Sequence, residues 1–383
     1  MKVLFINSVA GFGSTGRIAA DQCRKLMAEG HECVLAYGRD KANCDDIPTV
    51  CIGSKLDYQI HGVMSRVLDN HGFASKMSTR KFLQWAEEFD PDVLWLHNIH
   101  GYYLNVAQLF QWIKSRPEMR VKWTLHDCWT FTGHCAYFDY AGCDRWMTGC
   151  HNCPQKKTYP ASMLLDNSKH NFAKKRELFT GVKDMTLITP SAWMADLVKK
   201  SFLKEYPVEV VYNTINTDIF KPTESDFREK HGLENKKIIL GVASIWEKRK
   251  GLQDLLRLAD LVDDRWHVVL VGRIPEDQKT ELPANVLWVS RTDSPRELAE
   301  IYTAADVLVN PTYEDNYPTV NLEALACGTP VITYRTGGSP ESLDETCGIV
   351  TERDPQALWK AVQMAAFSSE ACLQRSKCIN TPH

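Results

Sequence analysis

The sequence predicts an α/β protein built from two doubly wound domains, each a parallel sheet with helices on both faces. Short apolar segments alternate with amphipathic ones, and this alternation restarts in the second half of the chain. The length of 383 residues also exceeds what one ordinary hydrophobic core serves. We expect a first domain at residues 1–212, a second at 213–365 and a C-terminal tail at 366–383.

The individual elements follow from apolar runs bounded by turn residues. The first half predicts strands at Val3–Asn7, Glu32–Tyr37, Val93–Leu96, Val121–Leu125 and Met185–Thr189, with a helix at Arg17–Glu29. The second half predicts strands in "KKIILGVAS", "WHVVLVG", "NVLWVS", "DVLVNP" and "TPVITYR". Ligands of open parallel sheets bind beyond the carboxyl ends of the strands, so two facing sheets predict one cleft with functional residues directly after strands.

Composition narrows the class of protein. Apolar residues make up 44% and charged residues 24%, as in soluble globular proteins, and a net charge of −3 does not suggest a nucleic-acid partner. No apolar run approaches the ~20 residues that span a bilayer. The start "MKVLFINSVAGFGSTG" lacks the pattern of a signal peptide, so we expect a cytoplasmic protein with reduced thiols.

A glycine-rich segment, "GFGSTG", follows the first strand. Gly11, Gly13 and Gly16 match G-x-G-x-x-G, which can place backbone N–H groups against a phosphate. The acidic residue of a dinucleotide site is imperfect, because Asp40 comes after the glycine and arginine of "AYGRD". A nicotinamide-dependent oxidoreductase and a turn without a ligand both remain alternatives.

The segment "NPTYEDNYPTVNLEALACGTPVITYRTGGSPES" carries the most informative pattern. Asp315 lies in a polar loop after a strand, and Glu323 lies eight residues later on the following helix. Carboxylates accept hydrogen bonds from vicinal hydroxyl groups, so the pattern favours recognition of a polyol such as ribose or a sugar. Gly337 and Gly338 then open the next helix as a second backbone site for an anion.

These motifs resemble those of family-4 retaining glycosyltransferases with the GT-B fold, of the bacterial surface-polysaccharide type. "EDNYPTVNLEA" is similar to the family's E-x7-E signature, with Asp315 in place of the leading Glu. The resemblance covers nearly the whole chain, through the first glycine loop, "TLHD", "TPSAWM", "VVYNTINTDIFKP", "GVASIWEKRKG" and "ALACGTPVITYRTGG".

The resemblance implies a role for each matching residue. His126 would contact the donor sugar, Lys250 would neutralise the departing diphosphate, Asp315 would act in the donor loop, and Glu323 would bind ribose. The other implied donor-binding residues are Gly13, Ser14, Arg249, Asn316, Tyr317, Gly337 and Gly338. The alternatives are a core histidine for His126 and a solvated charge for Lys250.

The resemblance also implies transfer with retention of anomeric configuration and without a catalytic metal, because the leaving diphosphate accepts the proton of the acceptor. The sequence departs from the family in two places. Ser244 stands where the family usually has an arginine, which Lys248 or Arg249 would replace, and the long returning helix at the C-terminus is not apparent.

Four cysteines occupy a loop at residues 131–160. Cys135, Cys143, Cys150 and Cys153 form C-x7-C-x6-C-x2-C, which predicts a structural zinc site that orders the loop. Packing cysteines and a disulfide are the alternatives. His134, His151 and Cys128 stand in reserve as ligands.

The donor is expected to be a UDP- or GDP-sugar and the acceptor a glycan or a lipid-linked glycan. His97, His100 and Tyr102, in "LHNIHGYYLN", are candidates for an acceptor wall. Residues 55–81 form a basic amphipathic stretch that suits either an anionic membrane surface or a solvated helix face. A non-catalytic sugar-nucleotide scaffold and an oxidoreductase remain rival functions.

Overall fold

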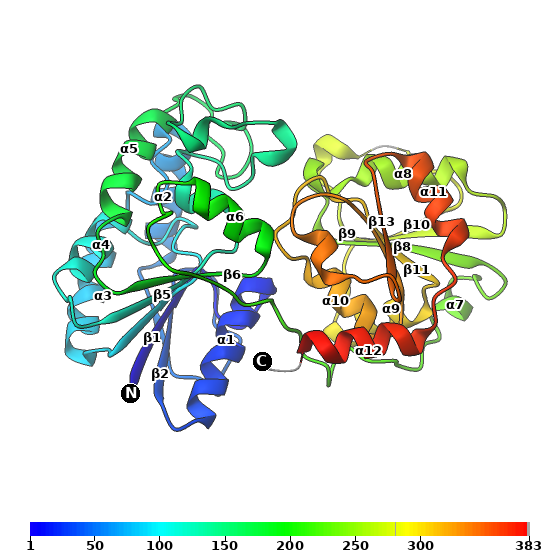
Figure 1. Ribbon diagram of the computed structural model, residues 1–383, viewed down its shortest axis with the longest axis horizontal. Helices are drawn as coiled ribbons and strands as arrows, with labels where there is room; N and C mark the ends of the chain where they lie inside the picture. Colours follow the sequence, from blue (N-terminus) through cyan, green and yellow to red (C-terminus); the bar gives the residue numbers. More distant parts are fainter. Residues whose placement is uncertain (280, 381–383) are drawn as a thin grey trace. The chain divides into compact units, whose positions relative to one another are not determined.

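The structure is a computed structural model that describes residues 1–279 and 281–380. It divides into two compact units, Met1–Val211 and Tyr212–His383, which are described separately below. In both units a parallel sheet has helices on its two faces (Figure 1).

Unit 1 contains a seven-stranded parallel sheet with the strand order β3-β2-β1-β4-β5-β6-β7. Its strands are β1 (Lys2–Asn7), β2 (Glu32–Tyr37), β3 (Thr49–Cys51), β4 (Val93–Leu96), β5 (Arg120–Thr124), β6 (Met185–Thr189) and β7 (Val208–Val210). Its α-helices are α1 (Gly13–Ala28), α2 (Lys55–Leu68), α3 (Lys76–Phe89), α4 (Val106–Lys114), α5 (Ser168–Phe179) and α6 (Ala192–Lys200).

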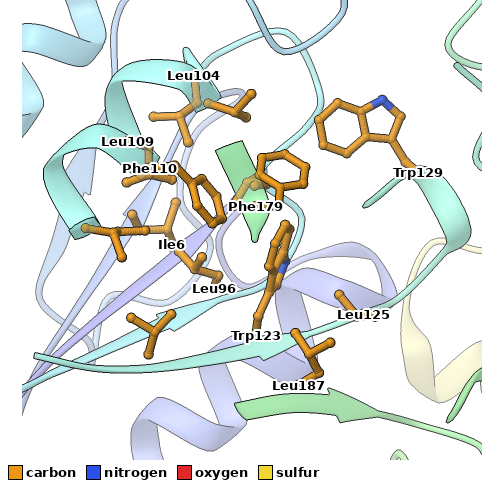
Figure 2. Packing of buried hydrophobic residues seen from close by; sticks show 14 of the residues in the cluster. Ile6, Leu96, Leu104, Leu109, Phe110, Trp123, Leu125, Trp129, Phe179 and Leu187 are labelled. Carbon is orange, nitrogen blue, oxygen red and sulfur yellow. The ribbon is translucent and has the colours of Figure 1, made fainter. Parts of the chain in front are cut away.

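Strand β1 shows why the strands of this sheet read as continuous apolar runs. Alternate side chains point to opposite faces, and here both faces are buried. Val3 and Phe5 belong to the cluster that includes α1, whereas Leu4 and Ile6 belong to the larger cluster on the other face. Figure 2 shows that larger cluster, where aromatic rings such as Phe110 pack close to the sheet.

Unit 2 repeats the design with a six-stranded parallel sheet in the order β10-β9-β8-β11-β12-β13. Its strands are β8 (Lys237–Ile245), β9 (Trp266–Arg273), β10 (Val286–Val289), β11 (Val307–Asn310), β12 (Val331–Tyr334) and β13 (Gly348–Thr351). Its α-helices are α7 (Phe227–Lys230), α8 (Leu252–Leu261), α9 (Pro295–Ala304), α10 (Thr319–Ala326), α11 (Pro355–Met364) and α12 (Ser369–Asn380).

Two features differ from the sequence-based expectation. The short strands β3, β7 and β13 had not been predicted, because most of their residues are half-buried or exposed and do not form a continuous apolar run. The expected tail at 366–383 contains helix α12, which is tied into unit 2. The Ile215 amide donates to Asn380 Oδ1 (2.9 Å), and Arg375 Nε donates to the Ser342 carbonyl (3.2 Å).

The strand order reverses once in each sheet. In unit 1 the reversal lies between β1 and β4, and in unit 2 between β8 and β11. At such a point the following connections run to opposite faces and leave a crevice at the carboxyl edge. The residues after these four strands are therefore placed to bind ligands. No helix among residues 1–279 and 281–380 is long and apolar enough to cross a membrane.

Candidate active site

Lys250 and Asp315 form the electrostatic centre of the unit 2 edge. Lys250 ends a short 3-10 helix (Lys248–Lys250) after β8, and Asp315 lies in the connection between β11 and α10. Lys250 Nζ is 2.5 Å from Asp315 Oδ2, and both side chains are largely buried. Burial lowers the pKa of Lys250, whereas Lys250 and Arg249 lower the pKa of Asp315 although burial alone would raise it.

The sequence left open whether Lys248 or Arg249 would replace the arginine that the family usually has at Ser244. In the structure, Arg249 is the residue that lies beside Asp315. Its guanidinium donates to the Glu314 carbonyl (3.0 Å) and lies 4.0 Å from Asp315 Oδ2, with a side chain only 13% exposed. Lys248 and Ser244 are exposed instead. A second buried positive charge therefore stands beside Lys250 despite Ser244.

Glu323 lies on α10, as the sequence predicted, and is buried. Tyr302, on α9, donates its hydroxyl to Glu323 Oε2 at 2.9 Å. This bond fixes one carboxylate oxygen, and the contact with the Glu323 carboxylate raises the pKa of Tyr302 further above the level that burial sets. Sequence analysis had not found Tyr302, because it precedes Glu323 by 21 residues in an ordinary amphipathic helix.

The loop that carries Asp315 is held from both sides by glycines. A Cβ on Gly251 would lie 2.1 Å from the Pro311 carbonyl oxygen, and one on Gly337 would lie 2.1 Å from the Asp315 carbonyl oxygen. Both glycines also have positive φ, 74° and 55°. Gly338 N donates to the Asp315 carbonyl (3.0 Å).

That last bond changes one expectation. The Gly337–Gly338 turn had been predicted as a backbone site for phosphate at a helix start. The helix that follows is a four-residue 3-10 helix, Ser339–Ser342, and the Gly338 N–H is already used by Asp315. The turn therefore positions the loop that carries Asp315.

Asn316 and Tyr317, the next residues of the loop, are both buried. The Asn316 backbone amide donates to Asp315 Oδ1 (3.0 Å). The Asp315 carboxylate therefore bonds to the backbone of its own loop as well as to Lys250. The Tyr317 carbonyl accepts from Asn213 Nδ2 (3.3 Å), and its ring lies 5.0 Å from that of Tyr212.

A buried amide network behind this loop had also been missed. Asn321 Oδ1 accepts from Asn310 Nδ2 (2.8 Å), and Asn321 Nδ2 donates to the hydroxyls of Ser339 (3.1 Å) and Ser342 (2.9 Å). The network joins the end of β11, helix α10 and the turn after β12. A polar residue inside the apolar run "VNLEALA" was the available signal.

In unit 1, the predicted glycine loop lies after β1. Gly13 begins α1 with φ 63°, and Gly13 and Ser14 are exposed at the helix start. Gly11 packs so closely that a Cβ would lie 2.2 Å from the Asn43 carbonyl oxygen. Asn7 Oδ1 accepts from the Asn98 amide (3.1 Å) and so links this loop to the one after β4.

His126 follows β5 and is half-buried. Its Nε2 lies 3.0 Å from Nδ1 of His97, which follows β4, and the two rings stack with centroids 5.2 Å apart. Burial lowers the pKa of His126 to about 4 and that of His97 well below its ordinary value. Both imidazoles are therefore neutral at pH 7.

The predicted acceptor wall is not an exposed surface. His97, His100 and Tyr102 are only 1%, 5% and 6% exposed. His100 lies between Asp127, with its Nε2 3.0 Å from Oδ2, and Tyr159, with its Nδ1 3.0 Å from the hydroxyl. These side chains instead form a buried polar layer beneath the carboxyl edge of the sheet.

The four predicted metal ligands converge. Cys135, Cys143, Cys150 and Cys153 line one small cavity in the loop, next to Trp146. The loop is ordered by two short 3-10 helices, Asp139–Ala141 and Arg145–Met147. All four thiols are unbridged. Yet within the described part of the chain, no group of three or more His, Cys, Asp or Glu side chains is arranged to hold a metal ion.

The three further residues that the sequence offered as possible zinc ligands are placed differently from one another. His134 Nδ1 lies 2.5 Å from Asp69 Oδ1, and both side chains are fully buried. Cys128 is buried in the apolar core, whereas His151 borders the cysteine cavity.

Comparison with known proteins agrees with this arrangement. The Glycosyltransferase Family 4 profile matches residues 15–219, more than half of the chain, and the "Glycosyl transferases group 1" profile matches residues 236–366. A protein of Escherichia coli (strain K12) named for colanic acid biosynthesis, the glycosyl transferase WcaC, is 29% identical over 362 residues. That alignment covers 91% of this chain and 86% of WcaC.

Solved structures show the same fold. Sucrose-phosphate synthase from Thermosynechococcus elongatus superposes with a TM-score of 0.73 at 16% identity, covering 99% of this chain and 95% of that one. Anabaena HepE in complex with UDP superposes with a TM-score of 0.68 at 16% identity, covering 99% and 94%. These matches support two α/β domains of the GT-B type and disfavour the oxidoreductase alternative. The chain belongs to glycosyltransferase family 4.

Proposed function

We propose that this glycosyltransferase moves a sugar from a UDP- or GDP-sugar to a glycan or lipid-linked acceptor in the assembly of a surface polysaccharide, with retention of configuration. The observation that carries the proposal is the set of Lys250, Asp315 and Glu323 around the β11–α10 connection. WcaC is named for colanic acid biosynthesis, which supports a polysaccharide as the product. HepE was solved with bound UDP, which supports a nucleotide sugar as the donor.

Each side chain suits one part of such a donor. The Glu323 carboxylate can accept hydrogen bonds from ribose hydroxyls, and Lys250 with Arg249 can hold the diphosphate. Negative charge grows on the diphosphate as the sugar bond breaks, so a fixed ammonium stabilises the transition state more than the ground state. Neutral His126 can hydrogen-bond a sugar hydroxyl.

In the proposed reaction the acceptor hydroxyl attacks the anomeric carbon from the face that the diphosphate leaves. The new glycosidic bond forms as the bond to the diphosphate breaks, and the diphosphate oxygen takes the acceptor proton. Lys250 and Arg249 supply the positive charge that a metal ion supplies in other transferases, so we propose metal-independent chemistry.

The test is release of nucleoside diphosphate by the purified chain from a panel of UDP- and GDP-sugars, with thermal shift on the same panel. NMR of the anomeric proton in the product reports retention. A protein that binds a donor in the thermal-shift assay but neither hydrolyses nor transfers it under any acceptor would be a sugar-nucleotide scaffold, against our proposal.

We further propose that unit 1 contacts the cytoplasmic face of an anionic membrane through α2. Leu56, Ile60 and Val63 on this helix are 63%, 52% and 59% exposed and recur at helical spacing. The Met163 amide donates to the Arg66 carbonyl (2.7 Å), which adds the exposed side chains of Met163–Leu165 to the same apolar surface. The same helix carries the exposed basic residues Lys55 and Arg66.

Vesicle co-sedimentation tests this contact. Wild-type protein should pellet with vesicles of anionic lipid and much less with neutral ones. Ile60→Glu with Val63→Glu should abolish pelleting, whereas Met364→Glu, at an equally exposed methionine of unit 2, should not. Equal pelleting of the double variant and wild type would leave α2 as a solvated helix.

Finally, we propose that the cysteine cluster takes one structural zinc ion. Convergence of four thiols on one cavity supports this, as does the Gly133 amide, which donates to Cys150 Sγ (3.2 Å). A hydrogen bond with Cys135 lowers the pKa of Cys153 to about 7, which favours a thiolate. The thiols would have to close around the ion from the positions they have here.

Elemental analysis of protein purified without chelators should then find about one zinc per chain. Cys150→Ser should lose the metal and lower the melting temperature, because ligation couples to folding of the loop. Cys378→Ser, at an exposed thiol of α12, is the matched control and should keep both. Metal far below stoichiometry with an intact melting temperature would mean packing cysteines.

A further inference from the structure

The pairing of His97 with His126 determines which nitrogen of His126 carries its proton. Nδ1 of His97 and Nε2 of His126 are 3.0 Å apart, so one of these atoms donates to the other. Neutral imidazole has one N–H, and the proton therefore sits either on His97 Nδ1 or on His126 Nε2. The two arrangements differ in what they leave at the far side of His97.

The far nitrogen of His97, Nε2, is buried and has no hydrogen-bond partner. If His126 were the donor, neutral His97 would carry its proton on this Nε2 and would bury an unsatisfied N–H. If His97 is the donor, Nε2 is a bare acceptor. Orphaned buried N–H groups are rarer than under-satisfied acceptors, so the second arrangement is favoured.

We infer that His97 is a positioning residue that donates from Nδ1 to His126 and thereby holds neutral His126 as the Nδ1–H tautomer. His126 then has a hydrogen-bond donor at Nδ1, and its Nε2 cannot act as a base because it already accepts. This inference rests on the proposed function only for its consequence, that His126 would donate to a sugar hydroxyl.

The surroundings of His97 hold its ring in this orientation. Its ring stacks on Phe5 and Trp95, with centroids 6.1 and 6.4 Å away, and its carbonyl accepts from Trp123 Nε1 (3.2 Å). Burial also keeps both imidazoles neutral, so a single proton lies in the hydrogen bond between them across the physiological pH range.

The tautomer can be read without any substrate. In protein labelled with ¹⁵N-histidine, the ring nitrogen shifts of the 12 histidines separate protonated from bare nitrogens, and His126→Gln assigns the signals. We expect a protonated Nδ1 and a bare Nε2 for His126, and the reverse pattern in wild-type protein overturns the inference. Failure of the proposed function would appear separately, as absence of transfer by wild-type protein with this tautomer in place.

Two matched variants test the role of His97. Asn places its amide nitrogen at the bond distance of Nδ1, and Gln places it at that of Nε2. His97→Asn should therefore keep the His126 tautomer and most of kcat. His97→Gln should give mixed His126 signals and lower kcat about 10-fold with the donor KM little changed. Equal spectra and equal kcat in both variants would show that His97 only fills space.

Discussion

The carboxyl edges of the two sheets carry different polar chemistry. After β8 and β11 in unit 2, charged side chains neutralise one another, with Lys250 2.5 Å from Asp315. After β4 and β5 in unit 1, most polar side chains are imidazoles: His97 and His126 bond to each other without a net charge, and His100 contacts the buried carboxylate of Asp127.

The difference shows how each sheet edge offsets the cost of burying polar side chains away from water. An isolated buried charge costs several kcal/mol, so unit 2 can hold its charges only in pairs. A neutral imidazole needs only a hydrogen-bond partner, so unit 1 can bury several of them. Removing one partner should consequently leave an uncompensated charge in the Lys250–Asp315 pair of unit 2, but only a lost hydrogen bond in the His97–His126 pair of unit 1.

The largest effect is expected from Lys250→Ala. It removes the ammonium that we propose to face the diphosphate and leaves Asp315 without its partner, so kcat should fall about 10²–10³-fold with a smaller change in donor KM. Steady-state kinetics with Lys248→Ala, an exposed lysine two residues away, is the control. A raised KM with unchanged kcat would show that Lys250 only binds.

Glu323→Ala should act on binding. Loss of a charged acceptor for ribose hydroxyls is expected to cost about 2–3 kcal/mol, or roughly 30–150-fold in donor affinity. Calorimetric titration with UDP or GDP measures this directly. Wild-type affinity in the variant would remove Glu323 from the donor site.

Tyr302→Phe should have a smaller effect, about 3–10-fold in donor affinity, because it frees one oxygen of Glu323 to rotate but keeps the charge. Tyr334→Phe provides a matched control, since Tyr334 donates to Asp254 in the same way (2.8 Å). Both variants should lose similar stability, and only the first should weaken donor binding. Equal donor affinity in the two would mean that Tyr302 serves packing alone.

The last prediction concerns stability instead of donor use, and it is a pH dependence confined to unit 1. Burial lowers the pKa of His61 and His126 to about 4, and it lowers that of His71 and His97 well below the ordinary value. Between pH 6.5 and 4 the unfolded chain binds protons that these folded histidines do not, so unit 1 loses stability as pH falls through this window.

Hydrogen exchange at pH 6.5 and 4.5, corrected for the intrinsic rate, can follow peptides from both units in one sample. Unit 1 peptides should lose protection first. Unit 2, where His267 alone among the described histidines has a resolved lowering of its pKa, is the internal control. Parallel loss in both units would contradict the assignment to the buried imidazoles.

The sequence predicted unit 2 better than unit 1 for a physical reason. Asp315, Glu323 and the Gly337 turn follow one another within about two dozen residues, so local motifs contained most of that edge. The Lys250–Asp315 pair depends on β8 lying beside β11, which hydrophobic periodicity does not encode. The same is true of His97 and His126, which meet because β4 lies beside β5.

Residues that act through others were the ones missed. Tyr302 holds Glu323, and Asn321 joins the end of β11 to the turn after β12, but neither carries a recognisable spacing. The burial of the candidate acceptor wall was not foreseen either, because polarity alone does not distinguish a buried histidine from an accessible one. His100 satisfies its polarity inside the fold, between Asp127 and Tyr159.

The two glycines that border the Asp315 loop limit how this enzyme can be altered. With no room for a methyl group at Gly251 or Gly337, the backbone from Pro311 to Asp315 has no slack to absorb an insertion or a shifted turn. A library that aims to change the sugar accepted should therefore leave loop length and both glycines fixed. Its diversity belongs in side chains such as Asn316, where the chemistry can vary while the main chain stays in place.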